Sequence, residues 1–223
     1  MNSRSNKSEH VLVWDLAVRV FHWSQVILLA ALWYTGTEGL MAQHQLLAYT
    51  LAALLIARIC WGFYGSLTAR FSHFAASPLA AVRYLRNPKP VLGHNPAGGY
   101  MIFALLSLLS VQILSGLATF DNSYISDGPL VRHLAEDWVS LASKIHKLNI
   151  DLILICVAVH ILAAIWHSIR HDNVIGAMVT GRSKASATVK APSLRASWSY
   201  FALAAVLLTV FYLWQGEMLL KFI

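Results

Sequence analysis

Long hydrophobic runs, separated by shorter polar stretches, dominate this chain of 223 residues. Five runs are close to the ~20 apolar residues that a helix needs to cross the hydrocarbon core of a bilayer. We therefore predict an all-α integral membrane protein, with a four-helix transmembrane bundle followed by a fifth, C-terminal transmembrane helix. The predicted spans are residues 18–35, 44–64, 100–120, 145–169 and 198–220.

Composition agrees with this fold class. Hydrophobic residues make up 57% of the chain and charged residues only 12%, whereas a soluble domain carries roughly 25% charged residues. The segment 182–197 is polar and rich in Ser and Lys, which predicts a flexible linker. It divides the chain into a main transmembrane domain (1–181) and an additional helix (198–223).

Lysine and arginine residues indicate the orientation. Four of them lie between the second and third spans and five between the fourth and fifth, whereas the loop after the first span has none. Positively charged loops stay in the cytoplasm, so we expect a cytoplasmic N-terminus. The placement of the basic residues in these loops accounts for the net charge of +7. Membrane lipid is therefore the expected neighbour, and nucleic acid is not an expected partner.

Imidazoles stand out within the hydrophobic runs. His146 and His160 are 14 residues apart, a rotation about 40° short of four full turns, so they share a helix face at levels roughly 21 Å apart. His44 begins the second run at the outer level, and His22 lies near the inner start of the first. These four residues form two predicted pairs: an outer pair, His44 with His146, and an inner pair, His22 with His160.

Paired imidazoles at two depths are typical of haem ligation. Two axial histidines suit a haem iron that transfers electrons without binding oxygen. The wide spacing of His146 and His160 cannot bring two ligands to one ion, which argues against an ordinary metal site. The chain contains neither CxxC nor CxxCH, so covalent haem attachment is not expected. We predict two stacked, non-covalent haem b groups, with iron held by His22, His44, His146 and His160.

Two further positions fit this arrangement. Arg58 follows His44 at the same spacing that separates His146 from His160, and so lies on the same face at the inner level. A charge inside a span usually has a partner, and a haem propionate would supply one. Gly36 follows His22 at this spacing too, and its missing side chain leaves space beside the outer haem; Gly116 in the third run could do the same.

The inner ligand on the fourth span has an alternative. His167 lies seven residues after His160 on the same face. It is only three residues from the interfacial Arg170, but His22 is equally close to Arg19, so depth does not decide between the two. Histidines in the tails and loops are not expected to bind iron.

Several segments together resemble the bacterial diheme cytochrome b561 and nickel–iron hydrogenase cytochrome b subunits. They are VWDLAVRVFHW, ARICWGFYGSLTARFSHF, LGHNPAGGY and the His-x13-His of the fourth span. The resemblance covers roughly residues 11–181, which identifies 1–181 as a cytochrome b561-type transmembrane haem domain. It implies the same four ligands and favours His160 over His167. The family core has four spans, so the fifth departs from that minimum.

The resemblance also implies a function, namely electron transfer across the bacterial inner (plasma) membrane. The chain has no nucleotide-binding glycine fingerprint, so both ends need redox partners. The family implies a quinone as one partner and a periplasmic redox protein, a c-type cytochrome or a hydrogenase, as the other. We expect an electron-transfer subunit rather than a stand-alone enzyme, and assign no catalytic residue.

Other functions and assemblies remain open. A superoxide oxidase that passes electrons to quinone is the alternative function, because Lys144 and Lys147 near the outer level could attract an anion. A homodimer is a further candidate assembly. The fifth span has no histidine. It is either a peripheral helix that contacts a partner or a fifth member of the bundle.

Overall fold

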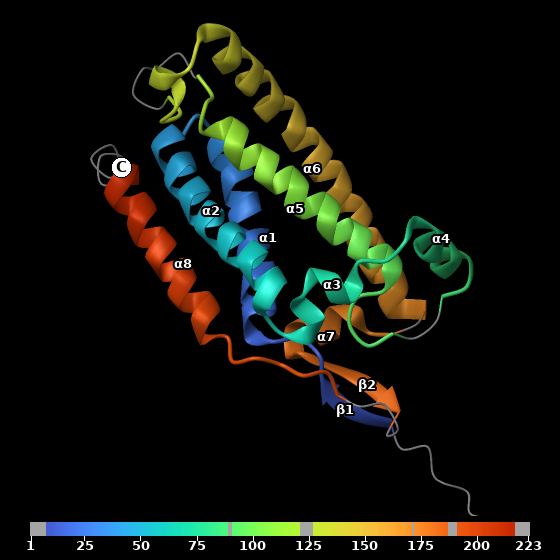
Figure 1. Cartoon of the computed structure of the whole chain (residues 1–223). Coiled ribbons are helices and arrows are strands. Elements are labelled where there is room, and N and C mark those ends of the chain that lie inside the picture. The colour runs from blue at the N-terminus through green and yellow to red at the C-terminus, as the bar shows by residue number, and fades with distance from the viewer. Residues whose placement is uncertain (1–7, 89–90, 121–126, 171, 187–190, 217–223) are drawn as a thin grey trace, which may run out of the picture.

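A computed structural model describes residues 8–88, 91–120, 127–170, 172–186 and 191–216 (Figure 1). Four helices are each long and apolar enough to cross a membrane. The predicted helical, multi-pass membrane architecture is thereby confirmed. The four are α1 (Leu16–Thr37), α2 (Met41–Tyr64), α5 (Pro96–Gly116) and α6 (Glu136–Arg170).

All four helices begin earlier than predicted, α5 by four residues and α6 by nine. The side chain of Asn95 caps α5 by accepting a 2.7 Å hydrogen bond from the backbone nitrogen of Gly98, and Pro96 occupies a first-turn position that suits proline. Helix α6 has 35 residues, which makes it about 52 Å long. Its first turns therefore extend beyond a hydrocarbon core of about 30 Å, where a hydropathy pattern gives no signal.

The predicted fifth span contains a shorter helix. Helix α8 (Trp198–Phe211) continues into the π-helical turn η3 (Tyr212–Gly216), and the apolar segment Trp198–Trp214 is shorter than the four spans. Residues 217–220 of the predicted span lie outside the described residues. In Figure 1, α8 runs along α2 on the flank of the bundle. That it crosses the membrane stays a prediction.

Small elements gather at one end of the bundle, which we call the sheet end (Figure 1). Strands β1 (Ser8–Leu12) and β2 (Arg182–Ser186) pair there in antiparallel register. The prediction of a flexible linker over 182–197 is thus wrong for its first five residues. Strand β2 forms by pairing with β1, which is distant in the sequence, and such pairing leaves no pattern in the local sequence. The short elements are η1 (Leu67–Ala69), α3 (Phe71–Phe74), α4 (Pro78–Arg86) and α7 (Val174–Thr180), while η2 (Val131–His133) lies at the opposite end.

Residues before α8 are fixed to the core. The carbonyl of Ser193 accepts a hydrogen bond from the backbone nitrogen of Leu67. The hydroxyl of Ser197 accepts one of 3.1 Å from the nitrogen of Ala17, at the start of α1. Tyr200, in the first turns of α8, is completely buried. The first turn of α8 is therefore anchored to the bundle core, although the helix as a whole runs along the flank of α2.

Helices pack as two neighbouring pairs. Helix α1 packs on α2, α5 packs on α6, and α2 also contacts α5, while α8 covers another side of α2. Apolar side chains from several helices form the buried core between them, including Phe21, Leu55, Leu109 and Ile153. This arrangement places α1 and α2, which carry His22 and His44, opposite α6, which carries His146 and His160.

Candidate haem sites

The structure brings the four predicted histidines together as two pairs. The ring centroids of His44 and His146 are 6.3 Å apart, with an interplanar angle of 81°. Those of His22 and His160 are 6.2 Å apart, at 56°. The outer pair joins α2 to α6, and the inner pair joins α1 to α6. Each pair thus links helices from opposite sides of the bundle.

These separations suit one metal ion between each pair of rings. A metal–imidazole bond is about 2 Å long and a ring nitrogen lies about 1 Å from its centroid, so two axial imidazoles have centroids about 6 Å apart. Among the described residues, no group of three His, Cys, Asp or Glu side chains could hold an ion. Two opposed imidazoles are the arrangement that a haem iron needs, because the porphyrin supplies the other ligands.

Hydrogen bonds orient both rings of the outer pair. The Nδ1 atom of His44 lies 2.9 Å from the carbonyl oxygen of Leu32, and that of His146 lies 3.0 Å from the carbonyl oxygen of Gln112. Nδ1–H is therefore the donor in each ring, which leaves the lone pair of Nε2 available to a metal. Donation of the second ring nitrogen to a carbonyl is the usual support for a metal-bound histidine.

The two outer rings rest on the same local motif, which we call the carbonyl–hydroxyl–glycine cradle. On α1 it consists of Leu32, Thr35 and Gly36, and the Thr35 hydroxyl lies 3.3 Å from Nδ1 of His44. On α5 the cradle consists of Gln112, Ser115 and Gly116, at the same sequence spacing, and the Ser115 hydroxyl lies 3.4 Å from Nδ1 of His146. In both cradles, the hydroxyl and the glycine lie one helical turn after the carbonyl that receives the imidazole proton.

Glycine in each cradle makes room for the ligand ring itself. A Cβ atom on Gly36 would lie 3.2 Å from Cε1 of His44, and one on Gly116 only 2.9 Å from Cε1 of His146. The sequence predicted that these glycines leave space beside a haem. In the structure, the space is used by the imidazole, which can then approach the helix backbone.

Gln112 makes a second contact with the outer pair. Its amide nitrogen lies 3.3 Å from Nε2 of His146 and 3.1 Å from the His146 carbonyl. Its amide oxygen accepts a 2.8 Å hydrogen bond from Asn149. Iron on Nε2 would replace the first contact only. The other bonds would still hold the Gln112 side chain in place.

The inner pair has different surroundings. Nδ1 of His22 is buried and has no hydrogen-bond partner in the described part of the chain. His167, the alternative inner ligand, has its Nε2 atom 2.9 Å from the hydroxyl of Tyr84 on α4. The ring that faces His22 is that of His160.

Arg58 is buried at the sheet end, with 3% of its surface exposed. Its guanidinium lies 5.6 Å from the ring centroid of Phe71, and its Nη1 atom has no hydrogen-bond partner among the described residues. Asp15 is the neighbouring buried acid, but its two oxygens accept from the nitrogen of Val18 at 2.8 Å and from the indole of Trp61 at 3.0 Å. Arg58 therefore keeps an unused donor, as a propionate ligand would require.

His94, in the GHNPAGG segment, lies near Arg58. Its ring packs against Trp14 and Phe74, with centroids 4.4 and 4.6 Å apart. Burial, and next the charge of Arg58, lowers the pKa of His94 to about 3. His94 is therefore neutral at physiological pH, and adds no positive charge to this region.

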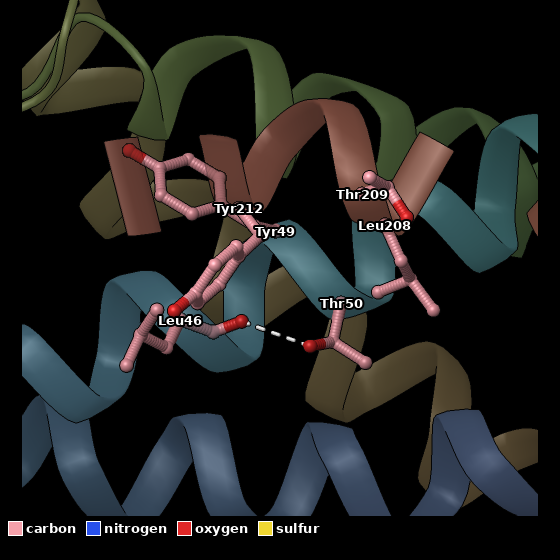
Figure 2. Close-up of a pocket in the computed structure, with 6 residues that line it drawn as sticks. All are labelled: Leu46, Tyr49, Thr50, Leu208, Thr209 and Tyr212. Carbon is pink, nitrogen blue, oxygen red and sulfur yellow. Dashed lines mark hydrogen bonds between the residues drawn. The ribbon is translucent and has the colours of Figure 1, made fainter. Parts of the chain in front are cut away.

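A pocket of about 360 Å³ lies between α2 and α8 (Figure 2). Tyr49 lines it and follows His44 by five residues, a rotation of about 140° around α2. The pocket is thus on a different face of α2 from the outer histidine pair. Its lining residues are Leu46, Tyr49, Thr50, Leu208, Thr209 and Tyr212.

Sequence reasoning missed the supports of these sites. The dipeptides Thr35-Gly36 and Ser115-Gly116 are a readable signal, since each sets a hydroxyl beside a glycine one turn after the carbonyl acceptor. The burial of Tyr200 has no such signal, because it depends on how α8 packs.

Comparisons with known proteins agree with this arrangement. Residues 13–181 match the family model described as prokaryotic cytochrome b561. The chain is also similar to a probable Ni/Fe-hydrogenase B-type cytochrome subunit of Rhizobium leguminosarum bv. viciae, with 24% identity over 78% of this chain and 88% of the relative. No solved structure matches the chain.

Proposed function

We propose, from the premise that this chain belongs to the prokaryotic cytochrome b561 family, that it carries electrons across the membrane between a quinone and a periplasmic redox protein. Membership confirms the resemblance seen in the sequence and makes the chain a membrane-bound b-type cytochrome of electron transport. The number of haems, their ligands and the two partners are our proposal.

Two non-covalent haem b groups are the proposed cofactors, one for each histidine pair. The observation that carries this proposal is the presence of two imidazole pairs, with centroids 6.2 and 6.3 Å apart, at two depths of one bundle. His44 and His146 would hold the outer haem, and His22 and His160 the inner one. When bound, haem iron supplies a site that accepts and releases one electron.

The protein's own groups would position and tune these haems. The two cradles fix the ring orientation of the outer ligands, and Arg58 provides a buried positive charge at the inner level. In the apolar interior of a membrane, the low local dielectric constant would strengthen the effect of that charge.

Electron transfer needs a partner at each membrane surface. The relative's name associates it with a Ni/Fe-hydrogenase, so a hydrogenase or a c-type cytochrome is our proposed periplasmic partner. A quinone dissolved in the membrane is the proposed second partner. The basic loops include residues of the sheet end, which supports a cytoplasmic sheet end and a cytoplasmic N-terminus in the bacterial inner membrane.

A spectroscopic experiment tests the haem proposal. The purified protein should show a b-type absorption spectrum, release two haems per chain into acidic acetone, and titrate as two redox components. Haem that stays on the polypeptide, or a stoichiometry near one, would contradict the proposal. Co-purification in mild detergent should recover the periplasmic redox protein, and cross-linking of the product would reveal a homodimer.

Superoxide oxidation is the second candidate function. Lys144 and Lys147 are exposed on α6 beside the outer ligand His146, where they could attract an anion. Mixing the oxidised protein with superoxide should then reduce the haems rapidly, and replacing both lysines by glutamate should slow this reduction. Reduction at the same rate in both proteins would leave the electron-transfer subunit as the better interpretation.

The domain division is also a proposal. Residues 1–181 would form the haem domain, 182–197 the connection and 198–223 an additional helix. The pairing of β2 with β1 and the burial of Tyr200 support a close structural link between the last two parts and the first.

A further inference from the structure

Where α2 and α8 meet at the sheet end, two buried hydrogen-bond donors have no partner in the part of the chain that the structure describes. Arg58 is 3% exposed and Tyr200 is 0% exposed. Within the described residues, neither Nη1 of Arg58 nor the hydroxyl of Tyr200 makes a hydrogen bond. The ring of Tyr200 packs against Trp61, which follows Arg58 on α2 by three residues, less than one helical turn. They are two unsatisfied donors in one buried region.

Such donors are costly. Leaving a buried polar group without a hydrogen bond destabilises the fold, and more so when the group is charged. Asp15 lies in the same region and accepts from Val18 and Trp61, but it makes no hydrogen bond to Nη1 of Arg58 or to the hydroxyl of Tyr200. A further carboxylate would satisfy both donors, because its two oxygens can accept from a guanidinium and a phenol at once.

Helical register indicates where this carboxylate comes from. Arg58 follows His44 on α2 at the same spacing at which His160 follows His146 on α6. The backbone of Arg58 therefore lies at the depth of the inner histidine pair, on the face of α2 that carries His44. A haem at that depth brings two propionate carboxylates of its own.

We propose that Tyr200 of α8 donates a hydrogen bond, beside Arg58, to a propionate of the inner haem. The proposal rests on the proposed function and extends it, since it makes α8 part of a haem site. The ring of Tyr200 is already held in position, with its centroid 6.3 Å from that of Trp61. Only the hydroxyl has no role within the described protein.

The conservative variant Tyr200→Phe tests this assignment. It removes the hydroxyl and keeps the ring, and loss of an unpaired buried hydroxyl does not itself destabilise the fold. A propionate without this donor keeps more of its negative charge near the iron and favours the oxidised state. The inner midpoint potential should therefore fall, with about a fivefold change in the oxidised-to-reduced ratio at fixed potential.

Tyr49→Phe is the matched control. Tyr49 is 5% exposed and its hydroxyl also lacks a partner among the described residues, but it precedes Arg58 by nine residues, about 14 Å along α2. It lines the pocket on the α8 side (Figure 2). Its variant should leave the inner potential unchanged.

A double variant shows whether Tyr200 and Arg58 share one ligand. If both bind the same carboxylate, the shift in Arg58→Leu/Tyr200→Phe should differ from the sum of the single shifts. The infrared difference spectrum of the parent should also contain a propionate band that moves in Tyr200→Phe.

Each outcome decides the proposal. Selective loss of the inner haem, or a lowered inner potential with a moved propionate band, supports it. An unchanged inner potential, additive shifts, or loss of both haems together would overturn it, because each indicates a structural hydroxyl. If the parent itself lacks two haems, the proposed function fails instead, and this is seen before any variant is made.

Discussion

The outer and inner histidine pairs have nearly the same ring separation but different surroundings. Both outer rings donate Nδ1–H to a backbone carbonyl, and each rests on a cradle with a hydroxyl and a glycine. At the inner pair, Nδ1 of His22 has no partner in the described part of the chain, and the buried charge of Arg58 stands at the same depth. One pair is supported by neutral dipoles, whereas a buried cation stands at the depth of the other.

This difference indicates how the two haems would be tuned. A carbonyl that accepts the Nδ1 proton makes the imidazole a more basic ligand, which stabilises oxidised iron and lowers the potential. A buried cation stabilises reduced iron and raises it. We therefore expect the outer haem to have the lower potential. Electrons would then pass downhill from the outer haem to the inner one.

Removing a ligand should have the largest effect. His44→Ala and His146→Ala should each abolish the same outer haem signal, because in our proposal the two rings hold one iron between them. His22→Ala and His160→Ala should each abolish the inner signal. Redox titration would show two components in the parent and one in each variant.

His167→Ala is the control for these variants. His167 contacts Tyr84 and should not be needed for either haem. If His167→Ala removes the inner haem while His160→Ala spares it, the inner ligand is misassigned.

Disturbing a cradle should have the next largest effect, and only on the outer haem. In Gly116→Ala, the new Cβ would lie 2.9 Å from the His146 ring, so the ring must move and its bond to Gln112 must weaken. Overpacking of this kind costs about 1–3 kcal/mol, so haem retention during purification should fall. In Gly36→Ala the closest approach is 3.2 Å, and the loss should be smaller. Equal losses of both haems would show that the glycines serve general packing.

Removing the buried charge should affect the inner haem alone. Arg58→Leu should lower the inner midpoint, because a positive charge that favours reduced iron is lost. At about 10 Å and an effective dielectric constant of about 20, the effect is roughly 1–2 kcal/mol, or about 40–90 mV for one electron. If the midpoint potentials of the inner and the outer haem are both unchanged in Arg58→Leu, Arg58 has a structural role instead.

The sequence predicts the two pairs because residues at the spacing of His146 and His160 share a helix face, whatever surrounds them. It does not predict the carbonyl acceptors of Leu32 and Gln112, since any residue supplies a carbonyl and only helix packing selects which one is used. Pairing of β1 with β2 was missed for a similar reason. The burial of Tyr200 shows the same limit, because hydropathy alone does not distinguish a peripheral helix from one whose first turns enter the core.

Removing one hydroxyl from a cradle should have the smallest effect. The Thr35 hydroxyl donates to the carbonyl of Ala31 at 2.8 Å, so its oxygen can act only as a second acceptor for His44 Nδ1. In Thr35→Val the bond from His44 to Leu32 remains, and the ligand becomes slightly less basic. The outer midpoint should rise by less than about 0.5 kcal/mol, roughly 20 mV, while the inner midpoint stays constant. Ser115→Ala should act alike through His146. A shift as large as that of Arg58→Leu would mean that the hydroxyls, not the carbonyls, determine the basicity of the outer ligands.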